Sequence, residues 1–255
     1  MKKWQNIDRL VPVSAVLALM ILWELLCRLF RVESYILPSP TEIFAVFSEK
    51  SGLLMTHTAF TLYEAVSGLL LSCVFGILAA LLMYRYRFFE LAASPLVVIS
   101  QTVPIIALAP LVMVWFGIGI GPKIGIVVLV CFFPVSLSAL SGFKSTEPGM
   151  ISLLKTMGAS DGRIFLEVCL PSAAPQIFTG IRMAATYSVM GAVIGEWLGA
   201  RAGLGIFMTR AISSHRADML FASVFVVVFI SLMLYGLTEL LQRLILPWNR
   251  KKGIF

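Results

Sequence analysis

The stretch Thr156–Pro171, TMGASDGRIFLEVCLP, is the polar exception in a very apolar chain. It carries charges of both signs and ends in Leu-Pro, whereas long hydrophobic runs lie on either side of it. A compact polar segment between two such runs predicts an ordered element outside the lipid, joined to a membrane span at each end. The apolar runs around it therefore determine the fold, and the segment itself bears on the function.

The composition is typical of α-helical integral membrane proteins. Of the 255 residues, 59% are hydrophobic and only 13% are charged, whereas soluble domains average about 25% charged residues. The mean hydropathy is +0.95. So little charge cannot cover the surface of a water-soluble fold of this size. Continuous apolar runs also predict helices rather than the alternating strands of a β-barrel, so we expect an all-α fold.

The net charge of +7 is better explained by the membrane than by nucleic acid, because Lys and Arg collect in cytoplasmic loops and orient the chain. The four cysteines form no CxxC pair, and three lie in or beside apolar runs. We expect them to be small hydrophobic side chains rather than metal ligands or disulfides. The N-terminal apolar run lacks a small-residue cleavage site and predicts a retained first span.

Six apolar segments predict six transmembrane helices, and we treat 1–255 as a single transmembrane domain. The segments lie at about 10–30, 64–84, 91–118, 124–143, 177–198 and 219–246. The third is long and contains Pro95, Pro104 and Pro110. Prolines at this density predict a kinked or broken helix, which membranes tolerate where neighbours or cavity water satisfy the freed carbonyls. A helix that lines a pathway often has this pattern.

The distribution of basic residues predicts that both termini are cytoplasmic. With the N-terminus inside, 13 of the 20 Lys and Arg residues fall in cytoplasmic segments and adjacent span ends, and 7 fall on the outer side. This asymmetry is the one that sets orientation in membrane proteins. The polar stretch quoted above then lies in the cytoplasm, between the fourth and fifth spans.

Two shorter segments predict amphipathic helices outside the spans. LPSPTEIFAVFSEK, which begins at Leu37, predicts a short capped helix at the outer interface. On the inner side, Pro148 suits the first turn of a helix and Gly158 suits its end. Apolar residues recur there at spacings of three and four: Met150, Ile151, Leu154 and Met157. They suit either a groove on a protein partner or the membrane surface.

The inner segment resembles the signature of permease subunits of bacterial ABC importers, EAA-x(3)-G-x(9)-I-x-L-P. Gly158 is followed by nine residues and then by VCLP at 168–171, so the spacing from the glycine onward is intact. SLL at 152–154 stands in place of Glu-Ala-Ala, which is a departure from the family pattern. The segment also lies where the family has it, between the fourth and fifth of six spans.

Other stretches are similar to the nitrate, sulfonate, taurine and pyrimidine-precursor permeases of that family. SQTVPIIALAPLVMVWFGIGIGPK at 100–123 matches their third-span pattern Q-x-x-P-x-x-A-x-x-P-L-x-x-x-W-F-G. LPSPTEIF, HTAFTLYEAVSG and GEWLGARAGLG are similar to the region before and into the second span and to the outer end of the fifth. The resemblance covers about 10–247.

The resemblance implies a type I ABC importer permease fold in the plasma membrane of a bacterium. The implied partners are an ABC ATPase subunit that binds the ATP, an extracytoplasmic solute-binding protein, membrane lipid and a second permease copy. A coupling segment at about 148–171 would dock on the ATPase. Its candidate residues are Ile151, Ser152, Leu153, Leu154, Met157, Gly158, Ala159, Leu170 and Pro171.

The sequence predicts neither an enzyme nor a cofactor of its own. It contains no P-loop, HExxH or GxSxG motif, so we expect no catalytic residue, metal site or ATP site in this chain. A secondary transporter driven by ions would instead show a carboxylate deep in a span and internal repeats, and a membrane enzyme would show clustered His or Asp residues. The sequence shows neither pattern.

The cargo and its pathway are predicted from individual residues. The TLYEA form around Glu64 resembles permeases for thiamin-precursor pyrimidines of the hydroxymethylpyrimidine or aminopyrimidine type, with sulfonate, taurine or nitrate as the alternative. The pathway candidates are Gln101, Glu64, Tyr187, Ser188 and Glu196. Their alternative roles are helix–helix hydrogen bonding, helix packing and ordinary interfacial charge. His57 and His215 are expected in solvent-side loops.

Overall fold

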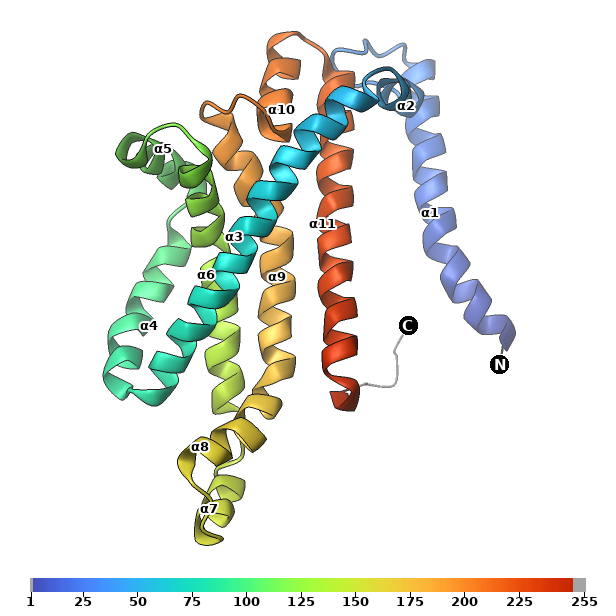
Figure 1. The fold of residues 1–255 in the computed structure, drawn as a ribbon. Coiled ribbons are helices and arrows are strands. Elements are labelled where there is room, and N and C mark those ends of the chain that lie inside the picture. Colours follow the sequence, from blue (N-terminus) through green and yellow to red (C-terminus); the bar gives the residue numbers. More distant parts are fainter. Residues whose placement is uncertain (1, 250–255) are drawn as a thin grey trace.

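The computed structural model describes residues 2–249, without the side chains of residues 2–10, 12, 13, 94, 96–101 and 249. All regular elements in this part of the chain are helical, which confirms the all-α prediction (Figure 1). They are α1 (Lys2–Leu29), α2 (Pro40–Glu49), α3 (Ser51–Arg85), α4 (Arg87–Thr102), α5 (Ile105–Phe116), α6 (Ile120–Lys144), α7 (Pro148–Thr156), α8 (Asp161–Ile164), the π-helix η1 (Phe165–Cys169), α9 (Leu170–Trp197), α10 (Leu204–Ser213), α11 (Ala217–Ile245) and the 3₁₀ turn η2 (Pro247–Asn249).

Four helices within the described residues are long and apolar enough to cross a membrane: α3, α6, the continuous helix Asp161–Trp197 and α11. They correspond to the second, fourth, fifth and sixth predicted spans. The helix α1 covers the first predicted span and has 28 residues, which makes it about 42 Å long at 1.5 Å per residue. The chain is therefore a multi-pass helical protein, as its composition predicts.

The third predicted span is broken into two helices, α4 with 16 residues and α5 with 12. The break falls at Val103 and Pro104, both of which have extended backbone conformations. Proline has no N–H to donate to the preceding turn and disfavours helix in the residue before it. The expectation of a kinked or broken helix is thus confirmed, and the break lies at the second of the three prolines.

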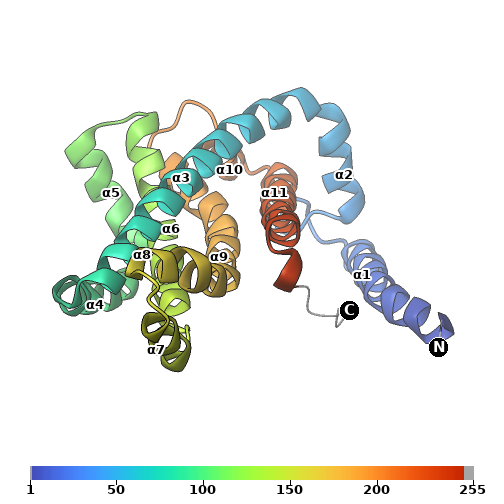
Figure 2. The same cartoon turned by 60° about the horizontal axis from the view of Figure 1, so that its bottom comes forward.

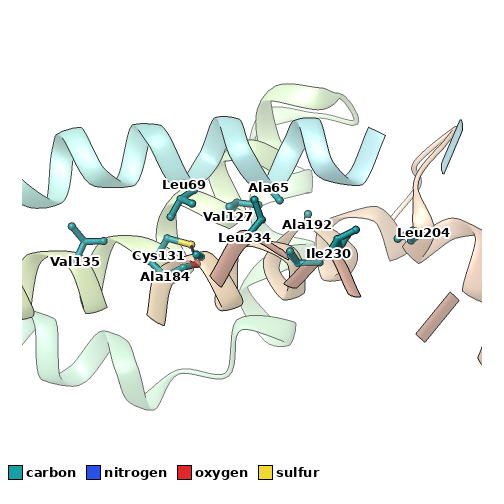
Figure 3. Close-up of a cluster of buried hydrophobic side chains, with 12 residues drawn as sticks. Ala65, Leu69, Val127, Cys131, Val135, Ala184, Ala192, Leu204, Ile230 and Leu234 are labelled. Carbon is teal, nitrogen blue, oxygen red and sulfur yellow. Dashed lines mark hydrogen bonds between the residues drawn. The ribbon is translucent and has the colours of Figure 1, made fainter. Parts of the chain in front are cut away.

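The core forms where α6 packs between α3 and α9, with α11 on the other side of α9. Figure 3 shows Ala65 and Leu69 of α3 beside Val127 and Cys131 of α6. Glycine permits the closest approach: a Cβ on Gly68 would lie 2.4 Å from a methyl carbon of Val127. Small residues at such contacts let membrane helices approach closely and pack through van der Waals contacts. This packing stabilises the bundle, because there is no hydrophobic driving force between helices in lipid.

The remaining helices lie around this core. The helix α1 stands apart from the bundle and touches α11 through Trp23, whose ring lies 5.8 Å from that of Phe221 (Figure 1). The pair α4–α5 lies on the opposite side of the core. The short helices α7 and α8 project beyond α6 and α9 at one end, and α2 and α10 lie at the other. We call these the α7 end and the α10 end.

The short helix predicted after Leu37 is confirmed as α2, and its start is a capping box. The Ser39 hydroxyl accepts from the Glu42 amide, while the Glu42 carboxylate accepts from the Ser39 amide at 2.8 Å. The Ser34 hydroxyl also donates to that carboxylate at 2.6 Å. These hydrogen bonds favour the charged form and hold the pKa of Glu42 below its ordinary value. The helix is therefore fixed at its first turn.

The Leu-Pro pair at the end of the opening stretch does not form a turn but lies within a helix. Leu170 and Pro171 begin α9, and η1 joins α9 to α8 without interruption. The Leu170 amide donates to the carbonyl of Phe165, five residues back. Because Pro171 has no N–H, the regular ladder cannot continue through it, and a π turn accommodates the change. The fifth helix therefore starts well before 177.

Candidate functional site

The helix α7 has the start and the end that its sequence predicts. Pro148 occupies its first turn, and Gly158 follows its last turn with a φ of 84°. The amides of Gly158 and Ala159 donate to the carbonyls of Lys155 and Leu154, both at 3.0 Å. This left-handed C-terminal arrangement favours glycine. The chain then reverses into α8, whose first residue, Asp161, pairs with Lys155 at 2.9 Å.

None of the described residues of α7 is buried. Three large apolar side chains are exposed at spacings of three and four: Met150 at 48%, Leu153 at 61% and Met157 at 74%. Ile151 and Leu154, which the sequence placed on the same apolar face, are instead half-buried. An amphipathic helix that exposes its apolar side chains beyond the ends of the spans has the surface that a protein groove would cover.

A groove of about 560 Å³ lies between the start of α5 and the facing sides of α6 and α9. Phe133 of α6 and Tyr187, Met183 and Met190 of α9 line it, together with Ser138 and aliphatic residues. None of the described side chains that line it is charged. The groove therefore suits a neutral, flat and partly apolar molecule, because a charged group there would lack compensation.

The five pathway candidates do not form one site, although the side chains of Glu64 and Glu196 interact with each other. Tyr187 lines the groove, whereas the neighbouring Ser188 is buried and donates to the carbonyl of Ala185 at 2.9 Å. Glu64 and Glu196 are buried at the α10 end. Gln101 belongs to α4, and its side chain lies outside the described residues.

Glu196 caps α10 from the preceding helix. One carboxylate oxygen accepts from the Thr61 hydroxyl at 2.7 Å and the other from the Gly205 amide at 2.6 Å. The Thr61 oxygen in turn accepts from the Leu204 amide at 2.8 Å. A negative charge at a helix N-terminus is stabilised by the free amides and by the helix dipole. The glycine before them, Gly203, has a φ of 127°, and a Cβ there would lie 2.1 Å from the Glu196 carboxyl carbon.

Two further contacts complete this end of the bundle. The Lys123 ammonium lies 2.7 Å from the Glu64 carboxylate, and both side chains are buried. The ring of His57 accepts from the Gly203 amide at 2.9 Å. The placement of His57 in a solvent-side loop is thus wrong: it is a buried residue of α3. His215 is exposed in the loop after α10, as expected.

Sequence reasoning missed Thr61 and Lys123 and gave His57 no role, because their partners are remote. Thr61 and Glu196 are separated by 135 positions, and Lys123 and Glu64 by 59. The one available signal was the glycine pair around Leu204, since closely spaced glycines beside a charged residue indicate a close backbone approach. The aromatic and methionine lining of the groove carried no signal that separates it from an ordinary core.

Comparisons with known proteins agree with this architecture. The family described as "Binding-protein-dependent transport system inner membrane component" matches residues 72–251. The formylaminopyrimidine transport permease ThiX of Halalkalibacterium halodurans is 38% identical, over 97% of this chain and 99% of its own. The riboflavin permease RibX of Chloroflexus aurantiacus is 31% identical over 94% and 90%, and the taurine permease TauC of Escherichia coli 29% over 97% and 94%.

A solved structure shows the same fold. A bacterial ABC transporter involved in the import of the polysaccharide alginate has a chain that matches with a TM-score of 0.62 at 17% identity. The match covers 95% of this chain and 99% of that one. At this identity the likeness concerns the fold alone. It extends over nearly all of the helices described above.

Proposed function

The chain belongs to the family of binding-protein-dependent transport system inner membrane components, and from this premise we propose that its cargo is a thiamin-precursor pyrimidine of the aminopyrimidine type. As a member of the family it is the multi-pass, inner-membrane permease of an ABC importer and not an enzyme. Such permeases work with an ATPase and a binding protein.

The observation that carries the cargo assignment is the uncharged groove between α6 and α9. A sulfonate group is permanently ionised, in taurine together with an ammonium group, and a buried sulfonate requires a cation or several donors. A neutral heteroaromatic ring requires only apolar walls and a few hydrogen-bond partners, which Phe133, Tyr187 and Ser138 offer. The higher identity to ThiX than to TauC supports the same choice.

The pathway candidates receive different roles in this proposal. Tyr187 contacts the cargo, and Gln101, on the broken third span, stays a pathway candidate from its sequence position alone. Ser188 sets the α9 backbone behind Tyr187. Glu64 and Glu196 act at the outer end by holding α3, α6 and α10 in place, where the cargo enters. Buried carboxylates that are paired with neighbouring helices, as Glu64 is with Lys123 and Glu196 with Thr61 and Gly205, suit positioning better than contact with a passing molecule.

The segment 148–171 is the proposed contact with the ATPase. A groove on that subunit accepts the side chains of Met150, Leu153 and Met157. The turn at Gly158 and Ala159 fixes the angle at which α7 meets the ATPase. The charge distribution supports cytoplasmic termini, which puts this segment on the ATP side. ATP binding then moves α7, and the cavity between two identical permease copies changes the side to which it opens.

Uptake by cells that lack other pyrimidine transporters tests the cargo. The permease is expressed with its ATPase and binding protein, and the uptake of radiolabelled formylaminopyrimidine, riboflavin and taurine is compared. We expect saturable uptake of the aminopyrimidine, without competition by taurine. Tyr187→Ala should lower this uptake by about tenfold, since stacking on an aromatic ring contributes about 1.5 kcal/mol. Leu232→Ala on the exposed side of α11 is the control. Uptake of taurine instead would overturn the assignment.

A further inference from the structure

Three aromatic rings meet where the cytoplasmic segment joins the spans. Tyr84 lies near the end of α3, Phe143 near the end of α6 and Phe165 at the start of η1. Their ring centroids are separated by 5.5 Å for Tyr84 and Phe143, 5.6 Å for Phe143 and Phe165, and 6.3 Å for Tyr84 and Phe165. We call this cluster the aromatic joint. It links three elements that are far apart in sequence.

The joint is buried at Phe143 and partly exposed at Tyr84 and Phe165. Phe143 is 1% exposed, and Cys169, at the other end of the π turn, is 2% exposed. The Tyr84 hydroxyl lies 3.7 Å from the Cys169 sulfur. Tilted aromatic pairs at these separations contribute beyond the area they bury. A displacement of η1 therefore acts on the ends of α3 and α6, because the ring of Phe165 contacts those of Tyr84 and Phe143.

The helix α7 makes few other contacts through which a movement could reach the membrane-spanning helices. None of its residues is buried, and it packs against α8, to which Lys155 is joined by its ion pair with Asp161. Ile151 lines the pocket that also contains Tyr84, Phe165 and Cys169. Figure 2 shows α7 and α8 at the ends of α6 and α9, and residues of α3 line the same pocket as residues of α7 and α8. A force on α7 is therefore transmitted either through the segment that connects α7 to α6 or through α8 and η1.

We propose that the aromatic joint is the mechanical link that converts a movement of α7 into a relative movement of α6 and α9. These two helices carry Phe133 and Tyr187, so their displacement changes the width of the groove. The π turn lies directly beside the rings, and π turns inside helices are frequent at functional sites. The inference rests on the proposed docking of α7 on the ATPase and assigns a new positioning role to Tyr84, Phe143 and Phe165.

The test is the number of cargo molecules transported per ATP hydrolysed. The permease is purified with its own ATPase and binding protein and reconstituted in liposomes, and transport and phosphate release are measured together. Phe165→Ala should retain the ATPase subunit and hydrolyse ATP while transport per ATP falls by about three- to thirtyfold, the range expected for mutations along a coupling network. Leu166→Ala is the matched control, because Leu166 belongs to the same π turn but is exposed.

Two conservative substitutions of Phe165 distinguish a loss of coupling from a folding defect. Phe165→Tyr keeps the ring and should restore coupling, whereas Phe165→Leu keeps apolar volume without a ring and should not. Tyr84→Phe removes only the hydroxyl beside Cys169, so we expect coupling close to that of the unchanged protein.

Three other results would contradict either the coupling role of the aromatic joint or the docking role of α7. Unchanged transport per ATP in Phe165→Ala would overturn the joint. Loss of the ATPase from the purified Phe165→Ala complex would overturn it as well, since the rings would then position α7 for docking only. A separate variant without residues 152–157 tests docking itself: if it still retains the ATPase, the proposed role of α7 fails, whatever the Phe165 variants show.

Discussion

Glu196 is a buried carboxylate whose two oxygens accept from one backbone amide and one hydroxyl group. Its carboxylate satisfies the N-terminus of α10 together with the Thr61 hydroxyl, and the glycines around Leu204 give it the room to do so. The arrangement joins α3, α9 and α10 with hydrogen bonds that lipid cannot replace. An unpaired amide in this place would cost more than in water, where solvent would satisfy it.

Thr61 is the residue on which this arrangement depends. Thr61→Val keeps the shape of the side chain but leaves the Leu204 amide without an acceptor and removes one donor from Glu196. We expect a loss of about 1–3 kcal/mol of stability, the cost of leaving a buried polar group unsatisfied. Thermal unfolding of the purified protein in detergent measures it.

Two variants of the same helix act as controls. Thr61→Ser retains the hydroxyl and should recover most of the stability. Thr56→Val removes an exposed hydroxyl that bonds only to the Gly52 carbonyl one turn back, so its melting temperature should equal that of the unchanged protein. A Thr61→Val protein as stable as the Thr56→Val protein would show that the hydroxyl does not hold α10.

The elements could be predicted from the sequence to the extent that local rules govern them. The membrane spans α3, α6, α9 and α11 could be predicted because a long apolar run is sufficient to identify them. The short helices α2 and α7 could be predicted because their capping residues are close in sequence. The π turn at 165–169 and the buried network around Glu196 were not visible, because both depend on packing between distant segments. The groove was also hidden, since its Phe and Met residues are equally typical of a core.

Gly158 decides how α7 ends. Its φ of 84° is in the left-handed region, and nothing lies within 4 Å of the position of a Cβ. The cost of a substitution there is therefore conformational and not steric. Asn adopts this conformation readily, whereas a β-branched residue does not. We expect Gly158→Asn to keep uptake near the unchanged level and Gly158→Val to lose most of it, at a cost of about 1–2 kcal/mol to the turn.

Uptake and recovery of the ATPase subunit are measured together for these variants. Gly149→Ala is the control, since this residue is inside α7 with an ordinary φ and no neighbour closer than 3.9 Å. It should leave uptake unchanged. Normal uptake and ATPase recovery with Gly158→Val would contradict the importance of this turn for docking.

At the scale of the whole molecule, one chain does not enclose a path. The groove is lined by the start of α5 and by α6 and α9, and no described residue of α11 lines it. The far end of α5 exposes Val114, Trp115 and Phe116. A hydrophilic edge of a cargo in this groove would face lipid if the chain acted alone. We expect a second copy, placed with its groove opposite the first, to close the path, because a two-fold arrangement uses the same surface on both copies.

Cysteine cross-linking tests this pairing. Met190 lines the groove and is 45% exposed, so in a two-fold pair Met190→Cys on the two copies face each other across the path. A short bifunctional maleimide should then yield a species of twice the 28.0 kDa chain mass. The unchanged chain, whose cysteines are buried or half-buried, and Leu232→Cys on the far side of α11 should remain at the mass of one chain. Cross-linking through Leu232→Cys but not through Met190→Cys would place the partner on the α11 side. The two copies would then be arranged back to back, and a different protein would have to close the groove.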